Sequence, residues 1–200
     1  MNKPPGILKL LFPSITWHKN RHEKNIYITF DDGPTPASTQ WIIDILKKYD
    51  AKASFFCLGE NAEKHPELIA LIKDSGHAIG NHGYAHINGW KTSTQSYLEN
   101  LEKGNILLQT NLFRPPYGKL KLKQYFKIKA KHQIVMWDYI STDYIQKADL
   151  DQAGEKMIKN IQNGSVVVFH DSEKAFSNMK YLLIKTLSHF SSKSYHFLPL

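Results

Sequence analysis

The pattern that most constrains the fold is an alternation of short β-rich runs with longer helical stretches. Several of the short runs are apolar at consecutive positions, as in Val166-Val167-Val168-Phe169, which is typical of parallel strands covered on both faces. The alternation predicts an α/β architecture, either a barrel or a doubly wound sheet. The expected strands are 25–30, 53–58, 77–80, 112–114, 133–140, 165–170 and 195–198, and the expected helices are 38–49, 62–75, 93–110, 119–129, 150–161 and 175–190.

The length and the distribution of turn residues indicate one domain. A chain of 200 residues can bury roughly two-thirds of the surface that its unfolded form exposes. No Pro/Gly/Ser-rich linker, internal repeat or low-complexity block divides it, and Gly and Pro fall mainly at junctions such as Gly33-Pro34. We predict a single domain over 25–200, preceded by an N-terminal extension, 1–24, that packs on it.

Composition excludes several classes of protein. The single cysteine, Cys57, rules out an intramolecular disulfide and is expected to be a buried thiol. A transmembrane helix is excluded because no run of about 20 consecutive apolar residues occurs. No signal-peptide cleavage pattern is evident, so a cytoplasmic location is the default, with association with the cell envelope left open.

The formal net charge of +8 raises the question of nucleic-acid binding. The lysines are spread along the chain, and no RNA-recognition or zinc-finger pattern accompanies them. Solvated helix faces explain the charge more simply, and we predict no nucleic-acid partner. Attraction to an anionic polymer surface stays open.

Two adjacent carboxylates, Asp31 and Asp32, stand where the first expected strand ends, directly before Gly33-Pro34. Neighbouring side chains of a regular strand face opposite sides, but a break at Gly33 would let both carboxylates reach one site. A nearby cation would keep both of them ionised. Taken alone, this sequence more often marks an Asp-Gly turn with solvated charges.

Two histidines, His82 and His86, are four residues apart, so we predict that they share a face of one helical turn and bind the same ion. Such a pair alone is a ligand pair only in a minority of cases. Together with one aspartate, however, it supplies the three ligands typical of a catalytic zinc site that keeps one position open. The other aspartate would then be free to act as a base.

Two further segments carry groups suited to catalysis. Arg114 lies in a proline-fixed loop and can fork onto a carboxylate, although a solvated arginine in a surface turn would look the same. His170 ends an apolar strand, where α/β barrels place catalytic residues, and its near-neutral pKa suits proton donation. By itself it is equally compatible with a histidine paired to Asp171.

In the segment 134–144, the fifth expected strand runs into an acidic and aromatic loop. Its rings, such as Trp137 and Tyr144, are able to stack on sugar rings. A tryptophan in such a strand is more often part of the core.

These five segments, in this order, resemble the polysaccharide deacetylases with a NodB-type homology domain, carbohydrate esterase family 4, over roughly residues 25–171. The resemblance implies a distorted (β/α)7 barrel. It also implies that Asp31 is the general base and that the ligands of Zn²⁺, or of a similar ion such as Co²⁺, are Asp32, His82 and His86.

The same resemblance implies the remaining roles. Arg114 would orient the base, His170 would be the general acid, and Asp143 would be its carboxylate partner. The backbone N–H of Tyr117 would stabilise the oxyanion.

Three positions depart from the family pattern. Gly83 stands where the family usually has Ser or Thr, Ile140 replaces an aspartate, and Tyr144 replaces a common tryptophan. None of the three is an expected ligand, acid or base. We therefore expect the departures to affect the choice of substrate rather than the reaction.

The expected function is the hydrolysis of acetyl groups from N-acetylated sugars of a peptidoglycan- or chitin-like glycan, with release of acetate. Two alternatives stay open: an O-acetyl esterase acting on xylan or a similar glycan, and a non-catalytic carbohydrate-binding barrel. The sequence does not predict the glycan, its chain length or the oligomeric state.

Overall fold

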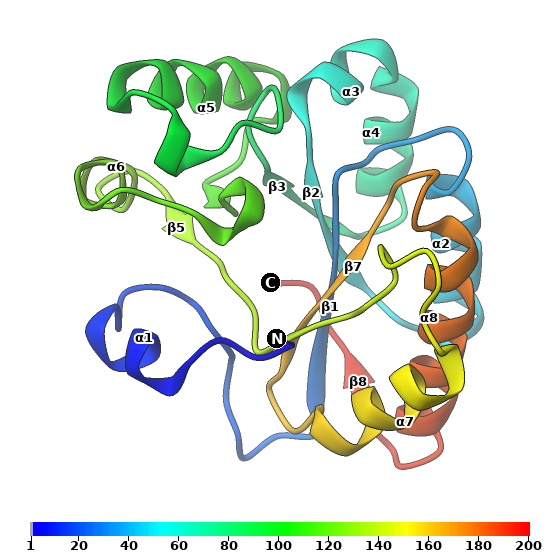
Figure 1. Ribbon diagram of the computed structural model, residues 1–200. Coiled ribbons are helices and arrows are strands. Elements are labelled where there is room, and N and C mark those ends of the chain that lie inside the picture. Colours follow the sequence, from blue (N-terminus) through cyan, green and yellow to red (C-terminus); the bar gives the residue numbers. More distant parts are fainter. Residues whose placement is uncertain (1) are drawn as a thin grey trace.

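The strands form one parallel sheet that curls into a half-barrel. The computed structural model describes residues 2–200 (Figure 1). Within this range seven parallel strands follow the order β5-β4-β3-β2-β1-β7-β6, and β8 pairs with the beginning of β1. This distorted (β/α)7 barrel confirms the expected fold. The strands are β1 Asn25–Asp31, β2 Ala53–Cys57, β3 Ala78–Asn81, β4 Leu112–Phe113, β5 Gln133–Ile134, β6 Tyr139–Ile140, β7 Val166–His170 and β8 His196–Phe197.

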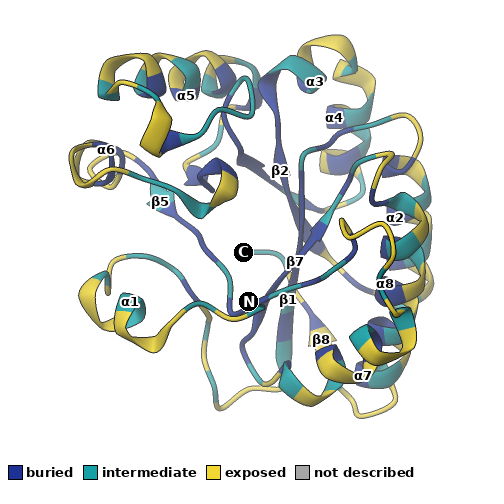
Figure 2. Cartoon of the chain, in the orientation of Figure 1, coloured by how far each residue is buried: buried dark blue, intermediate teal, exposed yellow. Residues whose placement is uncertain are grey.

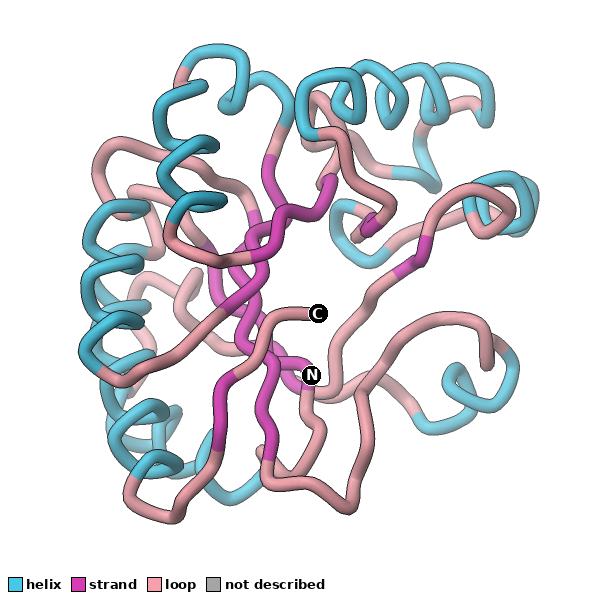
Figure 3. The backbone as a smooth tube through the Cα atoms, turned by 180° about the vertical axis from the view of Figure 1, so that it is seen from behind, coloured by secondary structure: helices cyan, strands magenta, loops and turns pink. Residues whose placement is uncertain are grey.

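Helices cover the outside of the curled sheet, as the view from behind shows (Figure 3). In α8, Met179, Leu183 and Leu187 recur at helical spacing and are fully buried, which gives the helix one apolar face against the strands. The helices are α1 Gly6–Leu11, α2 Thr39–Lys48, α3 Gly59–Lys64, α4 Pro66–Asp74, α5 Thr94–Leu108, α6 Leu122–Ile128, α7 Leu150–Asn160 and α8 Phe176–Ser191, with two 3₁₀ turns, η1 Gly89–Lys91 and η2 Pro116–Gly118.

The core lies between the central strands and the helices that cover them, and the strands are almost entirely buried (Figure 2). The Phe30 ring stacks on Phe55, with centroids 5.0 Å apart, and on Phe169, with centroids 5.9 Å apart. Cys57 is a free, fully buried thiol, as predicted. Among the described residues no helix has both the length and the apolar character needed to cross a membrane.

Two expected elements are each divided in the structure. The expected strand 133–140 is β5 and β6 with an irregular segment between them, because the chain there leaves the sheet and its carbonyls at Val135 and Met136 accept hydrogen bonds from Arg114. The expected helix 62–75 is α3 and α4, which meet at His65. Pro66 lacks an N–H and is favoured at the first position of a new helix, which explains the break.

The N-terminal extension spans the gap between the two edge strands of the sheet (Figure 1). Thr16 pairs in parallel with Val135 beyond β5, and His18 pairs antiparallel with Ser165 before β7. The buried carboxylate of Asp138 holds the extension through two ion pairs, with Lys9 at 2.7 Å and Arg21 at 3.0 Å. The extension therefore fills the seam that the divided β5–β6 segment leaves open.

Candidate active site

The sheet brings the predicted site residues together at the carboxyl-terminal ends of its strands. In the parallel register Asp31 at the end of β1 lies opposite His170 at the end of β7. Asn81 at the end of β3 lies opposite Phe113 in β4, so His82 and Arg114 follow directly at the same edge. Carboxyl ends of parallel strands are where α/β barrels assemble their catalytic residues.

The side chains of Asp32, His82 and His86 converge on one point. Asp32 Oδ1 lies 3.7 Å from Nε2 of His82 and 3.5 Å from Nε2 of His86, and one ligand atom from each of the three residues lies within 4.8 Å of the others. This Oδ1 is buried and has no hydrogen-bond partner. An orphaned carboxylate oxygen facing two imidazole nitrogens fits a divalent cation such as zinc.

The two histidines are held by a loop and not by the helical turn that their spacing predicted. β3 ends at Asn81, and residues 82–88 are irregular. The side-chain amide of Asn100 shapes this loop, because it accepts from the N–H of Ala85 at 2.9 Å and donates to its carbonyl at 3.0 Å. Gly83 has φ +87°, and a Cβ there would lie 2.6 Å from Asn100 Nδ2. In this chain, glycine at 83 is therefore required by the loop.

A hydrogen bond to the backbone fixes the tautomer of His82. Its Nδ1 lies 2.8 Å from the carbonyl oxygen of Arg114, and a carbonyl can only accept, so Nδ1 carries the proton. Nε2 is then left with a free lone pair that points toward Asp32. A hydrogen bond of this kind to the second ring nitrogen is the usual arrangement of metal-binding histidines.

Arg114 is fully buried and donates to Asp31 Oδ1 at 2.6 Å. The same nitrogen donates to the hydroxyl of Thr29 at 2.7 Å, and the guanidinium lies 4.1 Å from the centroid of the Phe56 ring. Burial alone would raise the pKa of Asp31, but the charge and hydrogen bond of Arg114, together with the charges of His82 and His170, outweigh burial and hold that pKa below its usual value. Asp31 is thus kept as a carboxylate.

His170 is paired with Asp143 and not with its neighbour Asp171. Nδ1 of His170 lies 2.8 Å from Asp143 Oδ1, and its backbone N–H donates to Asp143 Oδ2 at 2.8 Å. Burial would lower the pKa of His170, but the charge and hydrogen bond of Asp143, together with the charges of Asp31 and Asp32, raise it to about 9. The imidazole is therefore protonated at neutral pH and leaves Nε2–H to donate.

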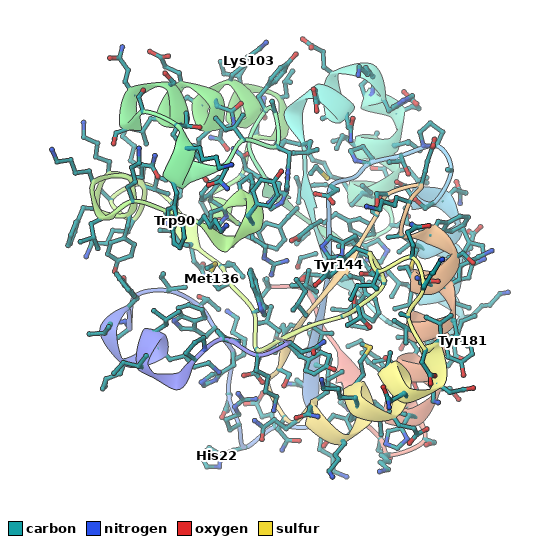
Figure 4. All side chains as sticks on the ribbon, in the orientation of Figure 1. His22, Trp90, Lys103, Met136, Tyr144 and Tyr181 are labelled. Atoms are coloured by element: carbon teal, nitrogen blue, oxygen red, sulfur yellow. The ribbon has the colours of Figure 1, made fainter. Side chains whose placement is uncertain are left out.

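Two tyrosines border the site from different sides. The Tyr117 ring centroid lies 4.4 Å from that of His86. The ring of Tyr144, which is labelled in Figure 4, meets the His170 imidazole edge-on with centroids 5.2 Å apart. Both rings are largely exposed. Trp137 instead packs on Gly118, where a Cβ would come within 2.6 Å of its ring, so its indole supports the loop that carries Tyr117.

Comparison with known proteins identifies the family. The family model described as polysaccharide deacetylase matches residues 18–137. The chain belongs to the polysaccharide deacetylase family. A peptidoglycan-N-acetylglucosamine deacetylase of Bacillus cereus is 30% identical over 92% of this chain and 89% of its own length. The predicted family and the predicted enzyme class, a hydrolase of the polysaccharide deacetylase type, are thereby confirmed.

Solved structures extend this likeness to the whole deacetylase fold. The Bc1960 peptidoglycan N-acetylglucosamine deacetylase, solved with 4-naphthalen-1-yl-N-oxidanyl-benzamide, superposes with a TM-score of 0.89 and 28% identity, covering 98% of this chain and 95% of that one. A second B. cereus peptidoglycan-N-acetylglucosamine deacetylase is 34% identical over 76% of this chain. This chain spans 57% of the length of that second relative.

Four residues of this deacetylase support the site but were not singled out from the sequence for that role. Asp171 accepts from the hydroxyls of Ser38 and Thr39 at 2.5 and 2.6 Å, and so holds the chain just after the two aspartates. Only distant contacts give such residues their role, so local sequence carried no signal for it. The others are Thr29, which bonds Arg114, Asn61, which donates to the Asp32 carbonyl at 2.8 Å, and Asn100.

Proposed function

We propose that this deacetylase removes acetyl groups from N-acetylated sugars of a peptidoglycan- or chitin-like glycan and releases acetate. One observation carries the proposal: three converging metal-ligand atoms, one of them an unpaired buried carboxylate oxygen, lie at the same sheet edge as a charged Asp31 and a protonated His170. Amide hydrolysis needs a base and an acid at once. The Arg114–Asp31 pair keeps the base ionised, and the Asp143–His170 pair keeps the acid protonated.

Asp32, His82 and His86 are the proposed ligands of a Zn²⁺ ion, with Co²⁺ as an ion of similar coordination. Two nitrogens and one oxygen with an open fourth position are the ligand set of catalytic zinc. A zinc ion bound there would act as a Lewis acid on the acetyl carbonyl and would acidify nearby water.

Asp31 is the proposed general base. Its Oδ1 is held by Arg114 at 2.6 Å, which leaves the other carboxylate oxygen to take a proton from the attacking water. Because the pKa of Asp31 lies below its usual value, the base is available across the neutral range. Arg114 thus positions and charges the base without touching the substrate.

His170 is the proposed general acid. An amine leaves poorly unless it is protonated, and the imidazolium held by Asp143 can supply that proton as the carbon–nitrogen bond breaks. The proposed oxyanion donor is the backbone N–H of Tyr117, whose φ of +59° sets the turn beside His86. The products are acetate and a free amino sugar.

Acetate release from matched substrates tests the proposal. The metal-loaded protein is incubated with chitooligosaccharides, N-acetylated peptidoglycan and O-acetylated xylan, and free acetate is measured. We expect release from one or both N-acetylated substrates. Release from O-acetylated xylan alone would instead identify an O-acetyl esterase, because the same acid and base serve the easier alcohol leaving group.

A non-catalytic binding barrel is the remaining candidate function. A protein that only binds sugars has no need of a charged Asp31 and a protonated His170 facing a metal-ligand set, so the geometry favours the enzyme. Full metal occupancy without acetate release from any of the three substrates would overturn the proposed deacetylase.

A further inference from the structure

Helices α1 and α6 lie on the side of the molecule opposite α7 and α8 (Figure 1), and apolar side chains of both helices are exposed. We call this surface the α1–α6 face. We propose that the α1–α6 face binds the surface of an anionic lipid bilayer. The apolar side chains that define it, with their exposed fractions, are Ile7 58%, Leu10 76%, Leu11 62%, Trp90 60%, Leu122 61% and Phe126 56%.

These six side chains come from α1, η1 and α6, and two of them, Trp90 and Leu122, line one pocket with Leu8 and Phe12. Thirteen large hydrophobic residues of the described chain are exposed, and nearly half of them belong to this one face. Helix α1 has no buried residue, and its exposed Leu10 and Leu11 are not explained by packing against the barrel. Clustered exposed apolar side chains mark interaction sites, whereas isolated ones are ordinary.

An open pocket of about 250 Å³ lies at the centre of the face. Trp90 and Met136 lie between α6 and α1 in the side-chain view (Figure 4). A pocket with this lining is suited to an aliphatic chain or another apolar group. Its lining residues are Leu8, Phe12, Ile15, Trp17, Trp90, Gly118, Leu120, Leu122, Tyr125 and Met136.

Two segments that contribute to this face carry an excess of basic residues. Residues 1–22 and 103–137 together contain twelve Lys and Arg and no Asp or Glu, while the rest of the chain contains fourteen basic and eighteen acidic residues. The net charge of +8 therefore comes from these two segments. Not all of this charge is free at the face, because Arg114 is fully buried against Asp31, and Lys9 and Arg21 pair with Asp138.

Individual lysines stand directly beside the apolar side chains. Lys119 Nζ lies 5.0 Å from the Trp90 ring centroid, and Lys129 Nζ lies 4.7 Å from that of Phe126. On α6, Lys123 and Lys127 are exposed. Lysines flanking leucine and aromatic side chains are the composition of interfacial membrane-binding surfaces, where the ammonium groups meet lipid phosphates and the apolar groups enter the acyl boundary.

Other binding partners would explain either the lysines or the leucines of the face, but not both. A nucleic acid or a phosphate polymer would pair with the lysines but leave Leu10, Leu11 and Leu122 in water. A second copy of the chain would cover the leucines but oppose two lysine-rich surfaces, which repel each other. An anionic bilayer satisfies both the charge and the apolar area.

The α1–α6 face adjoins the active site. Gly118 lines the pocket, and the preceding residue, Tyr117, contacts His86. A protein docked by this face would have its site beside the bilayer surface. The proposal does not depend on the substrate of the enzyme, because it concerns lipid binding by the folded chain.

Cosedimentation with lipid vesicles tests the proposal directly. The full chain is mixed with vesicles of phosphatidylglycerol or of phosphatidylcholine, and the bound fraction is measured at increasing salt. We expect binding to phosphatidylglycerol that weakens with salt, and little binding to phosphatidylcholine. The double variant Leu10→Gln/Leu122→Gln is expected to lower the partition coefficient roughly tenfold or more.

Control variants on the opposite side of the molecule distinguish binding through this face from nonspecific adsorption to lipid. Ile184→Gln on α8, where the side chain is 39% exposed, should leave vesicle binding unchanged. Lys123→Gln/Lys127→Gln should weaken binding, and Lys156→Gln/Lys159→Gln on α7 should weaken it much less. Circular dichroism and acetate release from a soluble chitooligosaccharide would show that each variant is folded.

Three outcomes would overturn the proposal. The first is the absence of cosedimentation with phosphatidylglycerol vesicles. The second is vesicle binding that the leucine double variant does not reduce, which would indicate charge attraction without apolar contact. The third is binding to duplex DNA or a polyglycerolphosphate that is as tight as binding to vesicles and equally sensitive to the leucine variant.

Discussion

The backbone carbonyl of Arg114 accepts a hydrogen bond from Nδ1 of His82 at 2.8 Å. The side chain of the same arginine donates to Asp31 at 2.6 Å. One buried residue therefore sets the tautomer of a proposed metal ligand and the charge of the proposed base. The proposed metal ligands and the proposed base therefore share one supporting residue, but substitutions in the two groups are expected to have different effects.

Asp31→Asn should abolish most turnover while the protein keeps its metal. The amide cannot accept a proton, so we expect kcat to fall by about a hundred- to ten-thousandfold. Asp32→Asn, by contrast, should lower metal affinity first. Acetate release and zinc content, both measured on each variant, distinguish the two aspartates, and near-normal turnover in Asp31→Asn would show that the base is assigned wrongly.

Zinc binding should require all three proposed ligands. We expect wild type to bind one equivalent of Zn²⁺ and His86→Ala to lose it, together with the rise in melting temperature that a ligand bound only to the folded state produces. His22→Ala is the matched control, since His22 is exposed and lies at the far edge of the molecule (Figure 4). Undiminished zinc content in His86→Ala would contradict the ligand set.

The activity should have an alkaline limit set by His170. The pKa of His170 is raised from 6.5 to about 9, so the Asp143–His170 pair stabilises the fold fully below about pH 6.5. That stability is lost as the pH rises through about 9. We expect kcat/KM to fall over the same range, because the neutral imidazole cannot donate.

Removing the charge of Asp143 tests the origin of this limit. Asp143→Asn should shift the alkaline limb of kcat/KM to lower pH, since the carboxylate is what raises the pKa of His170. The pH profiles of both proteins, measured with saturating zinc, give the comparison. An unshifted limb in Asp143→Asn would assign the limit to another group.

Gly33→Ala should destabilise the protein, because the added Cβ would overlap the carboxylate of Asp171. Overpacking of this kind costs about 1–3 kcal/mol. Gly6→Ala is the control, since a Cβ there meets nothing within 4 Å. Urea unfolding of the two variants measures the difference, and equal stability would mean that the loop after Asp32 can shift without cost.

Most of the strands could be predicted from sequence because each is a short apolar run with its own boundary. β7 ends at His170 as expected, and β1 ends at Asp31, one residue beyond the expected end. The divided strand 133–140 was not predictable, since its apolar residues look like a strand while its carbonyls are committed to Arg114. A side chain far away in sequence decided the local structure.

The sequence by itself determined which groups are present and that they stand at strand ends, because strand pattern and turn residues are local properties. Only the tertiary structure decided their partners. It showed that Asp143 rather than Asp171 holds His170, and that a loop rather than a helix joins His82 and His86. It also placed leucines from distant segments around one pocket. These are contacts between residues far apart in the chain, and they exist only when the sheet has curled and set its register.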